Sequence, residues 1–211
     1  MPDSARPAYV GWVRTSALGE KAGPPTHRIH SLSAPVFSRA DLKSPILMSL
    51  PAASLARVIA QEEGGYLQVG AGAWISALHA RSLDRPASSW LASAQLYIGQ
   101  PYAWGGTGAR GVDCSGLVQM SLALCGIDAP RDADQQEAAL GEPVALDAPW
   151  QAGDLLFWPG HVGILSAPDR LLHANATHMS VVEEPLQPAL QRIDAAGTPL
   201  RSVRRMTGVP L

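Results

Sequence analysis

Apolar and polar positions follow two different patterns along this chain of 211 residues. Up to about residue 85, apolar residues come in short runs separated by glycine and proline, which is typical of short strands in a small all-β barrel. From residue 86 onward, helical spacing comes first and strand patterns follow, which predicts an α+β layout. The runs of the first part are Tyr9 to Val13, Thr26 to Ile29, Leu55 to Ala60, Tyr66 to Val69 and Ala73 to Ile75.

A short pattern occurs twice within the first part. Gly11-Trp12-Val13 with Ser16-Ala17-Leu18 is matched by Ala73-Trp74-Ile75 with Ser76-Ala77-Leu78. The pattern resembles the closing strand of a bacterial SH3-like barrel, and the two copies are about 60 residues apart, the length of one such barrel. Each copy is therefore expected to end a barrel.

This resemblance implies three segments. Residues 25–85 are expected to form a complete SH3-like β-barrel, and residues 86–211 a second domain. Residues 1–24 are expected to be the closing strand of another SH3-like repeat or an N-terminal extension. Either residues 1–20 pair with the complete barrel, or an upstream module is missing from this chain.

Proline and serine mark the boundary between the two domains. Pro86 disfavours a helix before it, and Ser88 or Ser89 can cap a helix that continues to Ile98. So short a linker is expected to hold the domains against each other. Within the first domain, the segment from Ala34 to Leu55 has few strand signals and is expected to be a long loop, either solvated or reaching a neighbouring domain.

The strongest helical signal of the chain begins at Asp113, a good N-cap residue. Apolar side chains recur at helical spacing from Leu117 onward, and Gly126 supplies a C-terminal stop. Cys114 is therefore predicted in the first turn of a buried helix. The free N–H groups and positive dipole end of that turn stabilise a thiolate, so Cys114 is a candidate nucleophile. A lone cysteine of this kind can also be a small buried apolar residue.

The remaining elements follow in chain order. Asp132 and Gln135 are spaced as a capping box for a short helix that ends at Leu140. Alternating patterns separated by turn residues then predict an antiparallel sheet of five strands. These strands are residues 154–158, 161–166, 170–174, 179–183 and 200–206.

Charge and cysteine content exclude several classes of protein. The formal net charge of −2 gives no basic surface of the kind that nucleic acid or anionic lipid requires. No apolar run approaches the roughly 20 residues of a membrane span, and Met1 to Ser4 lack the features of a secretion signal, so a cytoplasmic location is expected unless the chain has been trimmed. Cys114 and Cys125 would lie about 16 Å apart on one helix, too far for a disulfide, and no cluster has zinc-like spacing.

Four motifs occur in a diagnostic order. Tyr102-Ala103-Trp104-Gly105-Gly106 precedes Asp113-Cys114-Ser115-Gly116, and Gly160-His161-Val162-Gly163 and Leu171-Leu172-His173-Ala174 follow. This order resembles the NlpC family of papain-like cell-wall cysteine peptidases over residues 87 to 209. The resemblance implies helices packed on an antiparallel sheet in the catalytic domain. The fold class expected for the whole chain is thus α+β, with a small all-β SH3-like barrel before the NlpC-type domain.

The resemblance also implies catalytic roles. Cys114 would be the nucleophile, His161 the base, and His173 the third polar residue that orients the base. Asn175 or His178 would replace His173 if the strand register differed by one step. The alternative for His161 is a solvated histidine at the start of a strand, and the cysteine motif argues against it.

Further residues are expected to bind substrate. The backbone N–H of Cys114 and the side chain of Tyr102 would stabilise the oxyanion, although Tyr102 could instead pack in the core. The loop bracketed by Gly105 and Gly111 would let the substrate backbone pass close to the nucleophile. The other expected substrate-binding residues are Trp104, Arg110, Asp113 and Ser115.

The implied substrate is a murein peptide, L-Ala-γ-D-Glu-diamino acid, cut between γ-D-glutamate and the diamino acid during recycling or remodelling of the cell wall. No metal or cofactor is expected, and the oligomeric state stays open. The first domain is expected to form one wall of the groove and to select peptides with a free N-terminal L-Ala, whose ammonium Asp113 would hold. The alternatives are an amidase or acyltransferase on the same scaffold and a non-catalytic protein that binds the cell wall.

Overall fold

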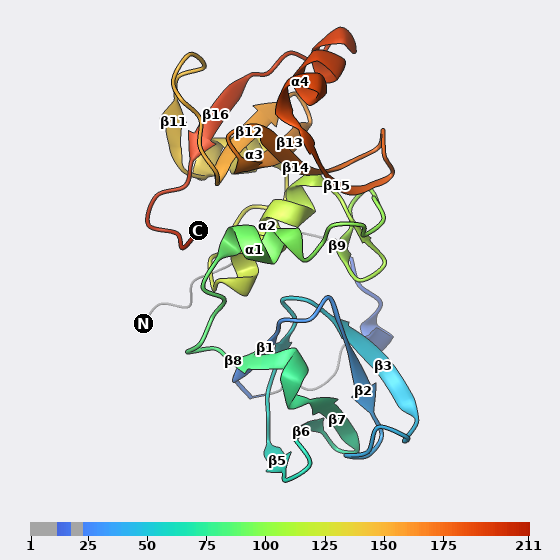
Figure 1. Ribbon diagram of the computed structural model, residues 1–211. Helices are drawn as coiled ribbons and strands as arrows, with labels where there is room; N and C mark the ends of the chain where they lie inside the picture. The colour runs from blue at the N-terminus through green and yellow to red at the C-terminus, as the bar shows by residue number, and fades with distance from the viewer. Residues whose placement is uncertain (1–11, 18–22) are drawn as a thin grey trace. The chain divides into compact units, whose positions relative to one another are not determined.

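The computed structural model describes residues 12–17 and 23–211, and the chain divides into two compact units, Met1–Arg85 and Pro86–Leu211 (Figure 1). Of the first copy of the repeated Trp-containing pattern, only the short 3-10 helix η1 (Thr15–Ala17) and the residues just before it are described. The rest of that copy lies outside the described residues. Its proposed pairing with the barrel therefore stays a prediction.

The described residues of the first unit form eight short strands in two antiparallel sheets. One sheet has the order β3-β2-β7-β6-β5 and the other the order β4-β1-β8. Their bounds are β1 (His27–Ile29), β2 (Ser33–Phe37), β3 (Ile46–Pro51), β4 (Leu55–Ala56), β5 (Ala60–Glu62), β6 (Tyr66–Gly70), β7 (Ala73–Ser76) and β8 (Ala80–Ser82), with a 3-10 helix η2 (Ala77–His79) between the last two. The side chains buried between them include Ile29, Ala34, Val36, Leu67 and Ile75.

Two expectations for this unit need correction. No sheet among the described residues closes into a barrel, so an SH3-like barrel is not confirmed. The segment from Ala34 to Leu55 is not a long loop, because β2 and β3 pair along it. Strand β3 was not predicted because its residues Ile46, Leu47 and Met48 are all apolar and all exposed, so they show no alternation of apolar and polar positions.

The second unit places its helices around a six-stranded antiparallel sheet with the order β11-β16-β12-β13-β14-β15. These strands are β11 (Glu142–Val144), β12 (Asp154–Trp158), β13 (His161–Ala167), β14 (Arg170–Asn175), β15 (Ser180–Pro185) and β16 (Ser202–Arg205). A small hairpin of β9 (Thr107–Gly108) and β10 (Gly111–Val112) precedes the sheet in the chain. The five strands predicted from alternation are confirmed to within about two residues at each end, while β11 was missed.

Four helices accompany this sheet. They are α1 (Trp90–Gln95), α2 (Cys114–Leu124), α3 (Ala133–Ala139) and α4 (Leu186–Ala195). Helix α1 begins after Ser89, whose hydroxyl accepts a hydrogen bond from the N–H of Ala92, but it ends earlier than Ile98. Asp132 is the N-cap of α3 without any side-chain capping bond, so the predicted capping box is wrong. Helix α4 was not predicted.

Apolar side chains fix α2 and α4 to the sheet. Helix α2 contacts β13 and β14, while Leu186 and Ala189 of α4 pack on Leu171 of β14. Figure 1 shows the two helices on opposite sides of the sheet. None of the helices in the described ranges is long and apolar enough to cross a membrane.

Candidate active site

Cys114 is the first residue of α2, as the sequence predicts. Asp113 caps the helix with extended backbone, and its Oδ1 accepts a hydrogen bond of 2.7 Å from the N–H of Gly116. The Cys114 side chain is 7% exposed, and its Sγ lies 4.0 Å from the carbonyl oxygen of Gly160, directly before β13. The structure therefore brings the thiol beside the strand that begins with His161. Both cysteines are free thiols.

The two histidines lie on neighbouring strands and are joined directly. Nε2 of His161 is 2.9 Å from Nδ1 of His173. The His173 side chain is almost completely buried, and its Nε2 is 2.7 Å from Oε1 of Glu184 on β15. Arg192 of α4 then donates to both oxygens of Glu184, at 2.6 and 2.8 Å. A continuous polar chain thus runs from His161 to Arg192.

The ordinary charge states of the thiol and the imidazole are shifted by their surroundings. Burial raises the pKa of Cys114, and backbone hydrogen bonds from Val162 and from the start of α2 only partly offset this effect. Burial, together with the nearby His173 and Arg192, lowers the pKa of His161 to about 3. Both shifts favour a neutral thiol beside a neutral imidazole. This environment disfavours the expected resting thiolate, because the loss of solvation on burial outweighs the stabilisation of the thiolate by the helix N-terminus.

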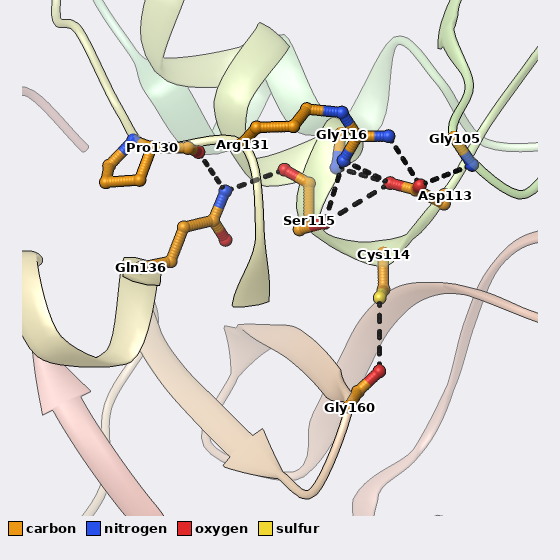
Figure 2. A network of polar contacts seen from close by, with 9 residues as sticks. All are labelled: Gly105, Asp113, Cys114, Ser115, Gly116, Pro130, Arg131, Gln136 and Gly160. Carbon is orange, nitrogen blue, oxygen red and sulfur yellow. Dashed lines mark hydrogen bonds and ion pairs between the residues drawn. The ribbon is translucent and has the colours of Figure 1, made fainter. Parts of the chain in front are cut away.

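A second polar network holds the nucleophile's helix in place (Figure 2). Arg131 donates to both carboxylate oxygens of Asp113, at 3.0 and 2.5 Å, and to Oγ of Ser115 at 2.9 Å. The N–H of Gly105 donates to Oδ2 of Asp113. Gln136 donates to the backbone carbonyls of Ser115 and Pro130. Asp113 and Ser115 are therefore engaged within the protein, and their expected contacts with substrate stay a prediction.

The other residues expected to bind substrate lie in the loop before α2. Burial and the charges of the nearby Cys114 and Asp113 raise the pKa of Tyr102. Trp104 is 92% exposed, and Arg110 is exposed in the turn between β9 and β10. Asn175 does not take the place of His173; its Oδ1 accepts hydrogen bonds from the backbone and ring of His178.

Glycines of this loop serve close packing inside the protein. A Cβ on Gly116 would lie 2.3 Å from the carbonyl oxygen of Gly106, and a Cβ on Gly106 would lie 2.5 Å from that of Gly111. The loop therefore packs backbone to backbone against the first turn of α2. This contact accounts for glycine at positions 106 and 116, and the expected passage of the substrate backbone along the loop stays a prediction.

Sequence reasoning missed four residues that surround the candidate nucleophile and histidines: Arg131, Gln136, Glu184 and Arg192. No local sequence signal marks Glu184, because its place opposite the buried Leu171 follows from the pairing of β14 with β15. Within the described ranges, no group of three histidine, cysteine or acidic side chains is arranged to hold a metal ion.

Comparison with known proteins found relatives for the second unit. Residues 99–193 match the NlpC/P60 family. The chain is 38% identical over 110 residues to a dipeptidyl-peptidase 6 from Lysinibacillus sphaericus, covering 50% of this chain and 40% of that protein. It is 35% identical over 99 residues to a gamma-D-glutamyl-L-lysine dipeptidyl-peptidase from Bacillus subtilis, covering 43% of this chain and 33% of that protein.

A solved structure extends the likeness to the fold. An NlpC/P60 family protein from Bacillus cereus has a TM-score of 0.71 at 22% sequence identity, over 86% of this chain and 63% of that one. The second unit therefore carries an NlpC/P60 domain, a domain of the peptidoglycan hydrolase family. The chain spans less than half the length of the two curated relatives.

Proposed function

We propose that this protein is a cysteine peptidase that hydrolyses the bond between γ-D-glutamate and the following diamino acid in murein peptides. The observation that carries the proposal is the position of the Cys114 thiol at the start of α2, beside the strand that carries His161. The name of the Bacillus subtilis relative, a gamma-D-glutamyl-L-lysine dipeptidyl-peptidase, supports this choice of bond.

Acyl transfer would begin from the neutral pair. As Sγ of Cys114 bonds to the substrate carbonyl carbon, the thiol proton moves to Nδ1 of His161, a nitrogen with no hydrogen-bond partner among the described residues. The carbonyl oxygen takes the negative charge. The backbone N–H of Cys114 at the helix N-terminus, with the nearby Tyr102, would stabilise this oxyanion.

The collapse of this intermediate breaks the C–N bond. His161 returns the proton to the leaving amine of the diamino acid, and the γ-D-glutamyl group stays on Cys114 as a thioester. Water then attacks the thioester, with His161 as the base, and the free thiol is restored. The hydrogen bond of His161 Nε2 to His173 would hold the ring in orientation throughout.

The direct test is incubation with L-Ala-γ-D-Glu-meso-diaminopimelate and with its L-lysine counterpart. We expect release of L-Ala-γ-D-Glu from at least one peptide, detected by mass spectrometry. Release of another fragment, or transfer to an added amine without hydrolysis, would instead indicate an amidase or acyltransferase. Binding to murein with no turnover would indicate a non-catalytic protein. The N-acetylated peptides test the proposed preference for a free N-terminal L-Ala, which predicts a lower kcat/KM for them.

A further inference from the structure

The polar chain continues beyond the histidine pair because of strand register. His173 stands opposite Val182 in the β14 and β15 pair, and Glu184 stands opposite Leu171. Glu184 is thus a diagonal neighbour of His173 on the same face of the sheet. Helix α4 begins directly after β15 and brings Arg192 to the same carboxylate.

Glu184 acts only as an acceptor in this arrangement. Burial by itself would raise the pKa of the Glu184 carboxyl, but hydrogen bonds from Arg192 and His173 outweigh it and lower the pKa to about 2. An ionised carboxylate has no proton to donate. The proton in the 2.7 Å contact must therefore be on Nε2 of His173.

The position of that proton determines the next one. Burial lowers the pKa of His173 even though Glu184 opposes this effect, so the ring is neutral and has one donor and one acceptor nitrogen. With Nε2 as the donor, Nδ1 of His173 must accept. Nε2 of His161, 2.9 Å away, must then supply the proton of this second hydrogen bond.

We infer that Glu184 is a positioning residue that fixes the tautomers of His173 and His161. In the resulting arrangement His161 carries its proton on Nε2 and a lone pair on Nδ1, the nitrogen that takes the thiol proton. Arg192 contributes by holding both oxygens of the carboxylate. The inference rests on the proposed peptidase function and adds two residues to its machinery.

The alternative arrangement shows why a fixed tautomer matters. If Nδ1 of His173 carried the proton, it would donate to Nε2 of His161, and neutral His161 would then be protonated on Nδ1. That ring could not accept a proton from Cys114. Both arrangements satisfy the hydrogen bond between the two histidines, so only the group beyond His173 distinguishes them.

Nitrogen-15 NMR of the histidine-labelled protein tests the inference without substrate. We expect both rings of the wild-type protein to carry the proton on Nε2 at neutral pH. In Glu184→Leu, which lacks the acceptor, the Nδ1-protonated form should become populated. A wild-type spectrum that shows the proton on Nδ1 of His161 overturns the inference. This measurement uses only the wild-type protein, so it does not depend on whether Glu184→Leu folds.

Kinetics on the murein tripeptide provide the second readout. Glu184→Leu should lower kcat by about 10- to 100-fold with little change in KM, as for other residues that orient a functional histidine. Glu184→Gln should retain most of the activity, because its amide oxygen can still accept from Nε2 of His173. The matched control is Glu183→Gln, which removes a carboxylate from the adjacent strand position, where Glu183 forms an ion pair with Arg170 at 3.6 Å.

The outcomes separate the inference from the proposed function. Equal losses in Glu184→Leu and Glu184→Gln, or wild-type kcat in Glu184→Leu, would overturn the positioning role. If the wild-type protein shows the Nε2 tautomers but cleaves no murein peptide, the peptidase proposal fails and the assignment of the tautomers stands.

Discussion

Nε2 of His161 and Nδ1 of His173 lie 2.9 Å apart, with the two ring planes inclined at 63°. With the proton of His173 on Nε2, facing Glu184, Nδ1 of His173 is the acceptor that orients the other ring. An amide oxygen at the same position can also accept, so His173→Gln should lose much less activity than His173→Ala. His161→Ala removes the base itself and should lose at least about 10²-fold in kcat.

The comparison of kcat across these three variants and the wild type checks this order. A folded protein must be shown in each case, because His173 is buried. Equal and severe losses in His173→Gln and His173→Ala would mean that the role of His173 is not simple orientation.

The nucleophile prediction distinguishes two cysteines that are equally buried. Cys114 and Cys125 are each 7% exposed, but only Cys114 lies at the start of α2. Cys114→Ala should abolish turnover, and Cys125→Ala should leave it near the wild-type level. Iodoacetamide, followed by peptide mapping, should inactivate the enzyme in proportion to modification of Cys114. Residual turnover near wild type in Cys114→Ala contradicts the mechanism.

Sequence patterns predicted those parts of the second unit that local rules specify. Alternation identified β12 to β16, and the capping preference of Asp113 identified the start of α2. Helix α4 was missed because Pro188 in its first turn and its many polar residues hide an amphipathic helix whose apolar side packs on the sheet. For the first unit, the sequence pattern predicts short strands joined by turns, but this pattern does not determine whether the sheets close into a barrel.

The candidate site likewise contains residues that local motifs predict and residues that they do not predict. Cys114, His161 and His173 stand in short motifs and were found from the sequence. Glu184 and Arg192 act through register and helix packing, which bring together residues that no local motif links. The role of Asp113 was only half anticipated, because its capping follows from the sequence whereas its ion pair with Arg131 depends on the tertiary fold.

The pH dependence of the thiol follows from the burial of the site. Since the pKa of Cys114 is raised, the thiolate fraction at neutral pH is below that of a free cysteine. The rate of alkylation by iodoacetamide should therefore be slow near pH 7 and climb into the alkaline range. A fast rate that is constant from pH 5 to 8 would indicate a resting thiolate and imidazolium pair and would contradict the neutral pair.

The acid limb of catalysis depends on His161. Its pKa is lowered to about 3 by burial, His173 and Arg192, so the neutral base persists well below the pH at which a solvated histidine becomes charged. The acid limb of kcat/KM should accordingly fall below pH 6, measured in a pH range where circular dichroism shows the protein folded. An acid limb near pH 6.5 would mean that His161 titrates as a solvated ring.

Gly163 allows β14 to approach β13 closely next to the histidines. A Cβ at this position would lie 2.7 Å from Cδ1 of the buried Leu171 and 3.4 Å from Cβ of His173. Gly163→Ala should destabilise the second unit by about 1–3 kcal/mol through overpacking and should lower kcat by displacing His173. Gly160→Ala would be a poor control because Gly160 has a φ of 71°, so Ala167→Gly, at the far end of β13, serves as the comparison. Wild-type kcat in Gly163→Ala would show that this contact does not position His173.

The ion pair between Arg131 and Asp113 should be a main source of stability around α2. Their side chains are only 13% and 11% exposed, and Asp113 also caps the helix. Arg131→Met leaves a nearly buried carboxylate without its cation. Breaking a buried pair in this way costs about 3–5 kcal/mol. We expect the low end of this range, because the N–H groups of Gly105 and Gly116 still donate to Asp113.

Denaturant unfolding followed by tryptophan fluorescence measures this loss. The matched comparison is Arg170→Gln, which removes a cation from a pair with Glu183 at 3.6 Å whose side chains are 37% and 29% exposed. Exposed pairs of this kind contribute about 0–1 kcal/mol, so Arg170→Gln should barely move the midpoint. If removal of a positive charge mattered and burial did not, the two variants would lose similar amounts of unfolding free energy. Equal, small losses would therefore show that Asp113 is stabilised by its backbone donors alone and that Arg131 is dispensable for the fold.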